Sequence, residues 1–376
     1  MVYFWKPSTS PLSLLLLSSC VTAASVQDVI SQRSELSMLN TLVNRFPNTL
    51  NQLNQGGGTL LAPSNTAISK LLLSAGIQDI TTVPESTVQD LMSYHILNLT
   101  LQSADLRKKG GVTVDTTLLK DQYANLGGRP NVIFSSAFGS VGEAPTATAL
   151  NIYSGVGDPA NVTTTDIGFD RGFVHVIDSV LNLPIPCTQT AKAASLSTLL
   201  NALMVANLTS FVDTTPKFTC FAPTDAAFQE AGINISALTN DQVVDALKYH
   251  SIVGDVGYST AFEDGQQYQT LLGVPVTITK RDGSLFINDV AVLQGNVMMS
   301  NGVAHVLSGV LSPVTAPKAT QTVVVKTTPG SPSASSKPDA QSAQTTSSAT
   351  SIAIPNMKIF FAIMIGLVSG ITILIL

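Results

Sequence analysis

The sequence predicts an α+β fold made of two consecutive domains with similar structures. Segments with helical spacing of apolar residues lie beside segments with strand alternation, which is typical of helices packed next to a small sheet. Three short motifs also occur twice in the same order. They are LLAPSNTAISKLL at 60–72 and CFAPTDAAFQEAG at 220–232, LMSYHILN at 91–98 and ALKYHSIVG at 246–254, and RGFVHVIDSVLNLP at 171–184 and NGVAHVLSGVLSP at 301–313.

Helices are expected at the start of each copy and before each Tyr-His pair. Thr239 and Gln242 form a capping box ahead of an apolar run, so the second Tyr-His pair falls near a helix end. The opening helices are indicated by apolar residues at helical spacing, which are Leu36, Leu39, Leu42, Val43 and Phe46 in one copy and Leu196, Leu199, Leu200 and Leu203 in the other.

Strands are expected in the second half of each copy. The alternating run at 274–279, the turn at 281–283 and the apolar run at 285–287 predict a β-hairpin. The segments around His175 and His305 are predicted to be strands, with alternate apolar residues facing the core.

Both ends of the chain carry processing signals. Residues 1–23 have one early lysine, an apolar run and small residues before the expected cleavage site after Ala23, which is typical of a secretory signal peptide. Residues 314–348 form a stalk rich in Ser, Thr and Pro. Residues 349–376 end in an apolar tail without following cations, which predicts a glycosylphosphatidylinositol (GPI) anchor signal with Ser348 as the attachment candidate. The alternative is a tail kept as a transmembrane helix.

The composition fits an exported glycoprotein. Only 11% of the 376 residues are charged and the net charge is −5, which gives no basic surface for nucleic acid. Cys187 and Cys220 are expected to form one disulfide in an oxidising compartment, with two buried free thiols as the alternative. Four sequons predict N-glycosylation, at Asn98, Asn161, Asn207 and Asn234.

The repeated motifs resemble the fasciclin-like domain, which has an opening strand with APS or FAPT, a central Tyr-His pair and a closing Gly-x-x-His strand. The resemblance assigns domains at 25–184 and 187–313. It implies a β-wedge sheet packed with helices, and a role in extracellular adhesion. In animal relatives the Tyr-His region is linked to receptor binding, so the resemblance makes Tyr94, His95, Tyr249 and His250 candidates for partner contact. The alternative is that these side chains pack at a helix end.

No enzyme, cofactor or metal is predicted. All four histidines, His95, His175, His250 and His305, occupy repeat-equivalent positions, which favours a structural role over a catalytic one. The chain has no CxxC pair, no HExxH and no calcium loop of EF-hand spacing. A chain without Trp after signal removal also lacks the best platform for stacking a sugar ring, although Tyr123, Tyr153, Tyr258 and Tyr268 remain.

The sequence therefore favours a non-enzymatic surface glycoprotein that mediates adhesion or contact with extracellular matrix or cell wall. Its expected partner is a cell-surface or matrix protein, a polysaccharide or a second copy of the chain, and its expected link to the membrane is the lipid anchor. Two alternatives stay open: a secretory-pathway or vacuolar membrane protein with lumenal domains, and an extracellular carrier of an apolar ligand.

Overall fold

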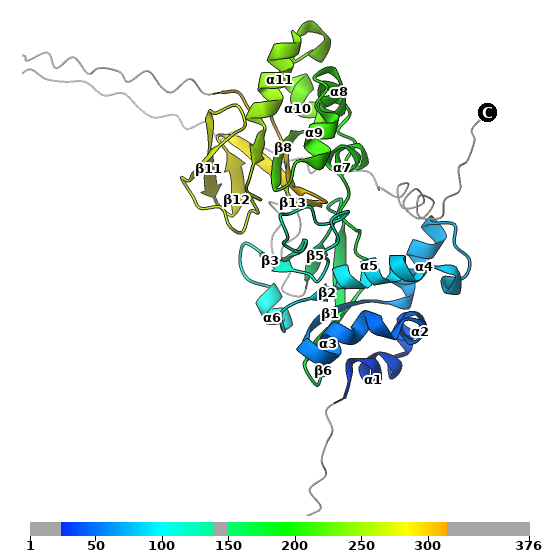
Figure 1. Cartoon of the computed structure of the whole chain (residues 1–376). Helices are drawn as coiled ribbons and strands as arrows, with labels where there is room; N and C mark the ends of the chain where they lie inside the picture. The colour runs from blue at the N-terminus through cyan, green and yellow to red at the C-terminus, as the bar shows by residue number, and fades with distance from the viewer. Residues whose placement is uncertain (1–23, 138–148, 314–376) are drawn as a thin grey trace, which may run out of the picture.

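The structure is a computed structural model that describes residues 24–137 and 149–313. It contains two units that each combine helices with a seven-stranded sheet, as the α+β prediction requires. Figure 1 shows the two units one above the other, with the first in blue to green and the second in green to yellow. The predicted signal peptide, stalk, anchor signal and Ser348 lie outside the described residues.

The first unit opens with short helices and closes with its longest strands. Its sheet has the order β2-β1-β7-β6-β5-β4-β3, in which only β1 and β7 run parallel. The helices are α1 Val26–Ser31, η1 Ser34–Leu36, α2 Ser37–Arg45, η2 Pro47–Leu50, α3 Asn51–Gly56, α4 Asn65–Ser74, η3 Ile80–Thr82, α5 Glu85–His95 and α6 Ser103–Leu106. The strands are β1 Gly58–Pro63, β2 Ile96–Leu97, β3 Val112–Asp115, β4 Val132–Ser136, β5 Asn151–Tyr153, β6 Pro159–Phe169 and β7 Gly172–Ile177.

The second unit repeats this arrangement. Its sheet has the order β10-β11-β12-β13-β14-β8-β9, and β8 and β14 are its parallel pair. The helices are α7 Cys187–Ala193, α8 Ser197–Val205, α9 Thr209–Thr214, α10 Asp225–Glu230, η4 Ile235–Ala237 and α11 Asn240–Tyr249. The strands are β8 Phe218–Pro223, β9 Ser251–Val253, β10 Gln267–Gln269, β11 Pro275–Arg281, β12 Ser284–Ile287, β13 Val290–Met299 and β14 Gly302–Leu307.

Local sequence signals explain several of these elements. The Thr239 hydroxyl accepts from the Gln242 amide at the start of α11, so the predicted capping box is confirmed. The predicted hairpin is also confirmed, since β11 and β12 pair antiparallel across Asp282 and Gly283. Both turn residues have positive φ, 51° and 80°, as a tight two-residue hairpin turn requires.

The central parallel strands are buried on both faces. Leu60 and Ala62 of β1 join the cluster under the helices, while Leu61 between them joins a second cluster inside the curved sheet. All six residues of β14 are buried in the same way. Val174 and Val176 face the helix-covered cluster, as the predicted alternation requires, and His175 between them is buried as well because the sheet curls over the face that the helices leave open.

Close strand approach explains the glycine that opens each closing motif. A Cβ on Gly172 would overlap the carbonyl oxygen of Gly58 across the β1–β7 pair. Gly302 stands in the same relation to Phe218 across the β8–β14 pair. A side chain at either position would force the two central strands apart.

The two units are in direct contact. Isolated bridges join Gly155 to Met298 and Ile185 to Met299. The Asn131 side chain donates to the carbonyl of Met299 at 3.0 Å and to that of Tyr123 at 2.6 Å. Backbone pairing and a buried amide thus tie β13 of the second unit to the loops and sheet of the first.

Candidate functional site

The two Tyr-His pairs lie inside the fold. The exposed fractions are 0% for Tyr94, 1% for His95, 1% for Tyr249 and 5% for His250. Side chains this buried cannot touch a macromolecular partner while the domains are folded. The expectation that they are partner contacts is therefore not supported, and packing at a helix end describes all four.

Each histidine of these pairs links its helix to the part of the last motif that follows the closing strand. His95 ends α5, and its Nδ1–H donates to the carbonyl of Leu91 at 2.7 Å while its Nε2 accepts from the amide of Leu181 at 3.0 Å. His250 makes the equivalent bonds, to the carbonyl of Ala246 at 2.8 Å and from the amide of Leu311 at 2.9 Å. Because Nε2 is the acceptor, both rings are held in one neutral tautomer.

The two tyrosines of the pairs differ in their surroundings. The Tyr94 hydroxyl donates to the carbonyl of Val132 at 2.9 Å, and Val132 belongs to a small cluster with Met298 of the second unit. Burial raises the pKa of Tyr94 well above its ordinary value. The Tyr249 hydroxyl instead accepts from the Asn288 side chain at 3.0 Å. The first tyrosine thus supports the contact between units, and the second fixes a loop within its own unit.

The other two histidines lie in β7 and β14, which confirms the prediction that the segments around them are strands. His175 donates to the carbonyl of Leu101 and accepts from the amide of Asp166. His305 donates to the carbonyl of Gly257 at 2.7 Å, but its Nδ1 has no hydrogen-bond partner among the described residues.

Burial depresses the basicity of these rings. Desolvation lowers the pKa of His95, His250 and His305 to about 4. Desolvation also lowers the pKa of His175. At neutral pH these rings are uncharged. Both ring nitrogens of His95, His175 and His250 are used in hydrogen bonds that hold the fold, whereas His305 uses only its Nε2 within the described part of the chain.

Cys187 and Cys220 lie together but are not joined. Both are buried free thiols in the structure, so the predicted disulfide is absent there and the alternative of two free thiols describes it. A hydrogen bond to Cys220, together with burial, raises the pKa of the Cys187 thiol well above its ordinary value. Packing of α7 and β8 into one hydrophobic cluster brings the sulfurs together without a covalent bond.

The four sequon asparagines are all exposed, but their side chains differ in freedom. Asn161 lies in β6, and its Nδ2 donates to the carboxylate of Asp178 at 2.8 Å. Asn234 caps η4 through its Oδ1, which accepts from the amide of Ser236 at 3.1 Å, so its Nδ2 faces outward without a partner in the described part of the chain. Glycosylation itself stays a prediction at all four positions.

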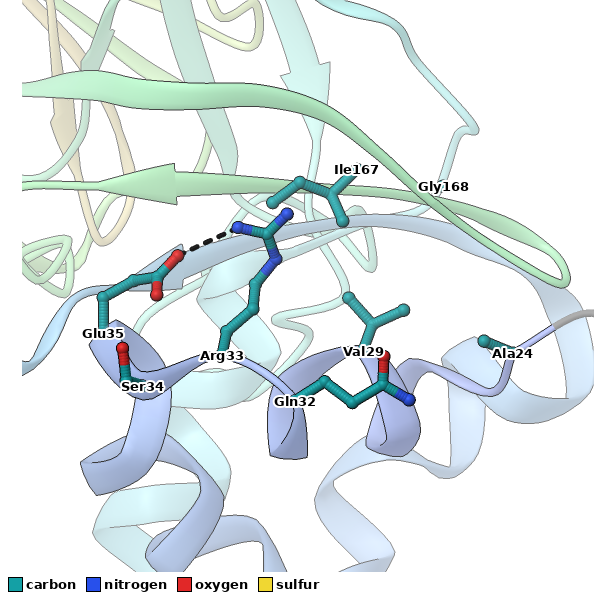
Figure 2. A pocket seen from close by; sticks show the side chains of 8 residues that line it. All are labelled: Ala24, Val29, Gln32, Arg33, Ser34, Glu35, Ile167 and Gly168. Atoms are coloured by element: carbon teal, nitrogen blue, oxygen red, sulfur yellow. Dashed lines mark hydrogen bonds and ion pairs between the residues drawn. The ribbon is translucent and has the colours of Figure 1, made fainter.

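A first hollow, of about 460 Å³, lies between α1, η1 and β6 (Figure 2). Figure 2 shows the Arg33 guanidinium between Ile167 and Glu35. Its Nη1 donates to the Glu35 carboxylate at 2.9 Å, so the two charges satisfy each other. The hollow therefore offers no free charge to a ligand.

A second hollow, of about 240 Å³, lies in the first unit beside the Tyr-His pair, and we call it the α5 groove. Its lining comes from η2, α3, α5, β2 and the segment after β3, and contains amides, hydroxyls and one aliphatic side chain. The lining residues are Asn48, Thr49, Gln52, Gln89, Ser93, Ile96 and Thr117. These residues could not be predicted from the sequence, because exposed amides on helices carry no motif that separates a site from an ordinary polar face.

Other kinds of site are not found in the described residues. Within 24–137 and 149–313, no group of three or more His, Cys, Asp or Glu is placed to hold a metal ion. The same ranges contain no helix that is both long enough and apolar enough to cross a bilayer.

The fold and the repeated buried motifs define a tandem domain protein in which the shared residues support structure. The model of the fasciclin domain matches residues 34–184 and 194–313, and the chain belongs to this family. It is 28% identical over 303 residues to a fasciclin-like arabinogalactan protein of Arthroderma benhamiae, covering 80% of this chain and 69% of that one.

Two further proteins are similar to this chain. The chain is 28% identical over 303 residues to fasciclin-like arabinogalactan protein elcF of Phaeosphaeria nodorum, covering 79% of this chain and 91% of that one. Among solved structures, it is similar to a FAS1 domain pair of the insect cell adhesion molecule fasciclin I, at 20% identity and a TM-score of 0.35. That match covers 74% of this chain and 97% of the other.

Proposed function

We propose that the protein is a non-enzymatic glycoprotein of the cell surface that contacts the extracellular matrix, the cell wall or neighbouring cells through its two fasciclin domains. The observation that carries the proposal is the family match over both domains. Relatives described as fasciclin-like arabinogalactan proteins, similar along about four fifths of this chain, give it further support.

The ends of the sequence supply the proposed location. A signal peptide at 1–23 would direct the chain into the secretory pathway, and a GPI anchor attached at Ser348 would hold it on the outer leaflet. The stalk at 314–348 would separate the domains from the membrane, with an upper reach on the order of 100 Å. Display of many copies on one surface would strengthen contacts that are weak for a single domain.

The proposal is tested on cells that carry a tagged chain. Treatment with a phosphatidylinositol-specific phospholipase should release the tag into the medium, and deletion of the gene should reduce cell aggregation or attachment to matrix. An intracellular tag that resists the lipase would support the lumenal membrane protein instead. Unchanged aggregation and attachment after deletion would refute the adhesive role.

A further inference from the structure

We propose that the α5 groove of the first domain is the binding site for a neutral polysaccharide, with one sugar unit seated in the groove. The proposal rests on the proposed surface function and adds to it the domain, the residues and the chemical class of the partner. The groove contains about 240 Å³, less than the ~300 Å³ at which pockets for drug-sized ligands begin. That volume suits a single ring of a longer chain.

The lining residues offer hydrogen-bond donors and acceptors but no charged group. None of the seven lining residues is ionisable, so neither a phosphate nor a uronic acid finds a cation there. Sugar hydroxyls both donate and accept, and the amides and hydroxyls of the groove do the same. A neutral polyhydroxylated ligand is the class that matches this lining.

Some of these groups are held in place by hydrogen bonds within the protein. The Thr49 hydroxyl donates to the carbonyl of Phe46 at 2.7 Å, and the Thr117 hydroxyl donates to that of Ser93 at 3.0 Å. Each therefore presents its oxygen as an acceptor. The Gln89 Nε2 donates to Glu85 at 2.9 Å, which leaves the Gln89 carbonyl oxygen free to accept.

Other groups keep their full capacity for a ligand. The Gln52 amide and the Ser93 hydroxyl make no side-chain hydrogen bond within the described residues, although both line the groove. The Asn48 oxygen accepts from Asn51 at 3.0 Å, which leaves the Asn48 Nδ2 as a donor. The groove thus combines fixed acceptors with adjustable donors.

The backbone beside the groove disfavours a peptide. An extended peptide binds a sheet edge through unpaired backbone groups. Here the amide of Thr117 already donates to the carbonyls of Ser93 and Ile96, at 3.1 Å and 2.9 Å. The groove has side-chain polarity without an open strand edge, which favours a carbohydrate over a peptide.

The second domain does not repeat this lining. Counting back from the Tyr-His pair, Val244 replaces Gln89 and Lys248 replaces Ser93. Leu271 occupies the position equivalent to Thr117. Its amide donates to the carbonyl of Ser251, just as the amide of Thr117 donates to that of Ile96. Leu271 is also 40% exposed, so at these three positions the second domain has apolar or cationic side chains in place of polar neutral ones. The binding site is therefore assigned to the first domain alone.

The test uses the intact mature protein with neutral oligosaccharides as probes. Hexasaccharides of glucose, mannose and N-acetylglucosamine are compared with an acidic oligogalacturonide and a short amide-capped peptide by saturation-transfer NMR. At least one neutral hexasaccharide should receive saturation. The variant Q52A/Q89A should weaken that signal about tenfold, because two hydrogen-bonding side chains are lost, while the matched variant Q55A on the same short helix should not.

The outcomes separate this proposal from the proposed function. Transfer to no neutral probe, preference for the acidic probe or the peptide, or an unchanged signal in Q52A/Q89A would each overturn the groove assignment. Circular dichroism of Q52A/Q89A should match that of the parent, and S93A provides a second, smaller truncation in the same groove if it does not. If deletion of the gene still reduces attachment while the groove fails these tests, the adhesive role stands and its site lies elsewhere.

Discussion

Acid should destabilise this protein well above the pH at which carboxylates titrate, because three imidazoles are buried in the neutral form. Burial lowers the pKa of His95, His250 and His305 from the ordinary 6.5 to about 4. The unfolded chain therefore binds more protons than the folded one between these values. The stability that the neutral rings provide is complete above about pH 6.5 and is lost as the pH falls toward 4.

The magnitude follows from this interval. At pH 5 the unfolded imidazole is 1.5 pH units below its pKa, whereas the buried ring is still neutral. At ~1.36 kcal/mol per pH unit, each ring therefore lowers the free energy of unfolding by about 2 kcal/mol. The three together reach about 6 kcal/mol, a large part of the 5–15 kcal/mol typical of a native protein. The second domain contains His250 and His305, and the first contains His95 and His175, whose pKa is also lowered, so both domains should lose stability in acid.

Carboxylates with a lowered pKa do not interfere in this range, whereas burial raises the pKa of Asp158, so protonation of Asp158 opposes the effect of the imidazoles. Hydrogen bonds lower the pKa of Asp28 and Asp79 below 3.8, and that of Glu35 below 4.5. A lowered carboxyl pKa supplies stability that disappears only below the unfolded value. Between pH 7 and pH 5 the imidazoles therefore dominate the slope.

The assay is urea unfolding of the mature protein followed by circular dichroism at pH 7, 6 and 5. As the pH is lowered, the free energy of unfolding should fall. Near pH 5 its slope against pH should correspond to nearly three more protons bound by the unfolded chain than by the folded one. The variant H250Q keeps a polar side chain but cannot ionise there, so it should lose about one third of that slope whatever its stability at pH 7. A slope below one proton in the parent protein would show that the rings are not buried as described.

Three further outcomes are expected. In thermal unfolding, G172A should lower the free energy of unfolding by more than about 3 kcal/mol, because its methyl group overlaps the backbone of β1. The control G168A in the same hairpin meets open space, so its free energy of unfolding should stay within about 0.5 kcal/mol of the parent value. Y249F should cost about 1–2 kcal/mol through the amide that loses its acceptor, and wild-type stability would contradict that bond. Glycopeptide mass spectrometry should find Asn234 occupied more often than Asn161, whose side chain is held by a carboxylate, and equal occupancy would count against this reasoning.

Much of the fold could be predicted because the relevant signals are local. The capping box at Thr239, the turn at Asp282 and Gly283, and the strands that carry His175 and His305 all follow from short patterns. Burial on both faces of β14 could not be predicted in this way. It depends on the sheet curling over its own inner face, which is a long-range property.

The candidate site could be predicted much less well, and the reason is physical. A repeated Tyr-His pair stands out in the sequence because the fold demands those residues twice: His95 and His250 each close a helix onto the end of the domain. Such residues are conspicuous because they are buried and fully bonded, which also removes them from contact with a partner. The features that repeat in this chain are therefore those that hold the domain together.

Binding specificity must then come from what the two copies do not share. The α5 groove fits that requirement, because Gln89 and Ser93 flank the first Tyr-His pair where Val244 and Lys248 flank the second. The buried pair fixes the end of α5, and the exposed residues beside it are free to vary without cost to the core. A surface of neutral amides also agrees with a chain in which only 11% of residues are charged. The low charge thus suits recognition by directed hydrogen bonds rather than by long-range electrostatic attraction.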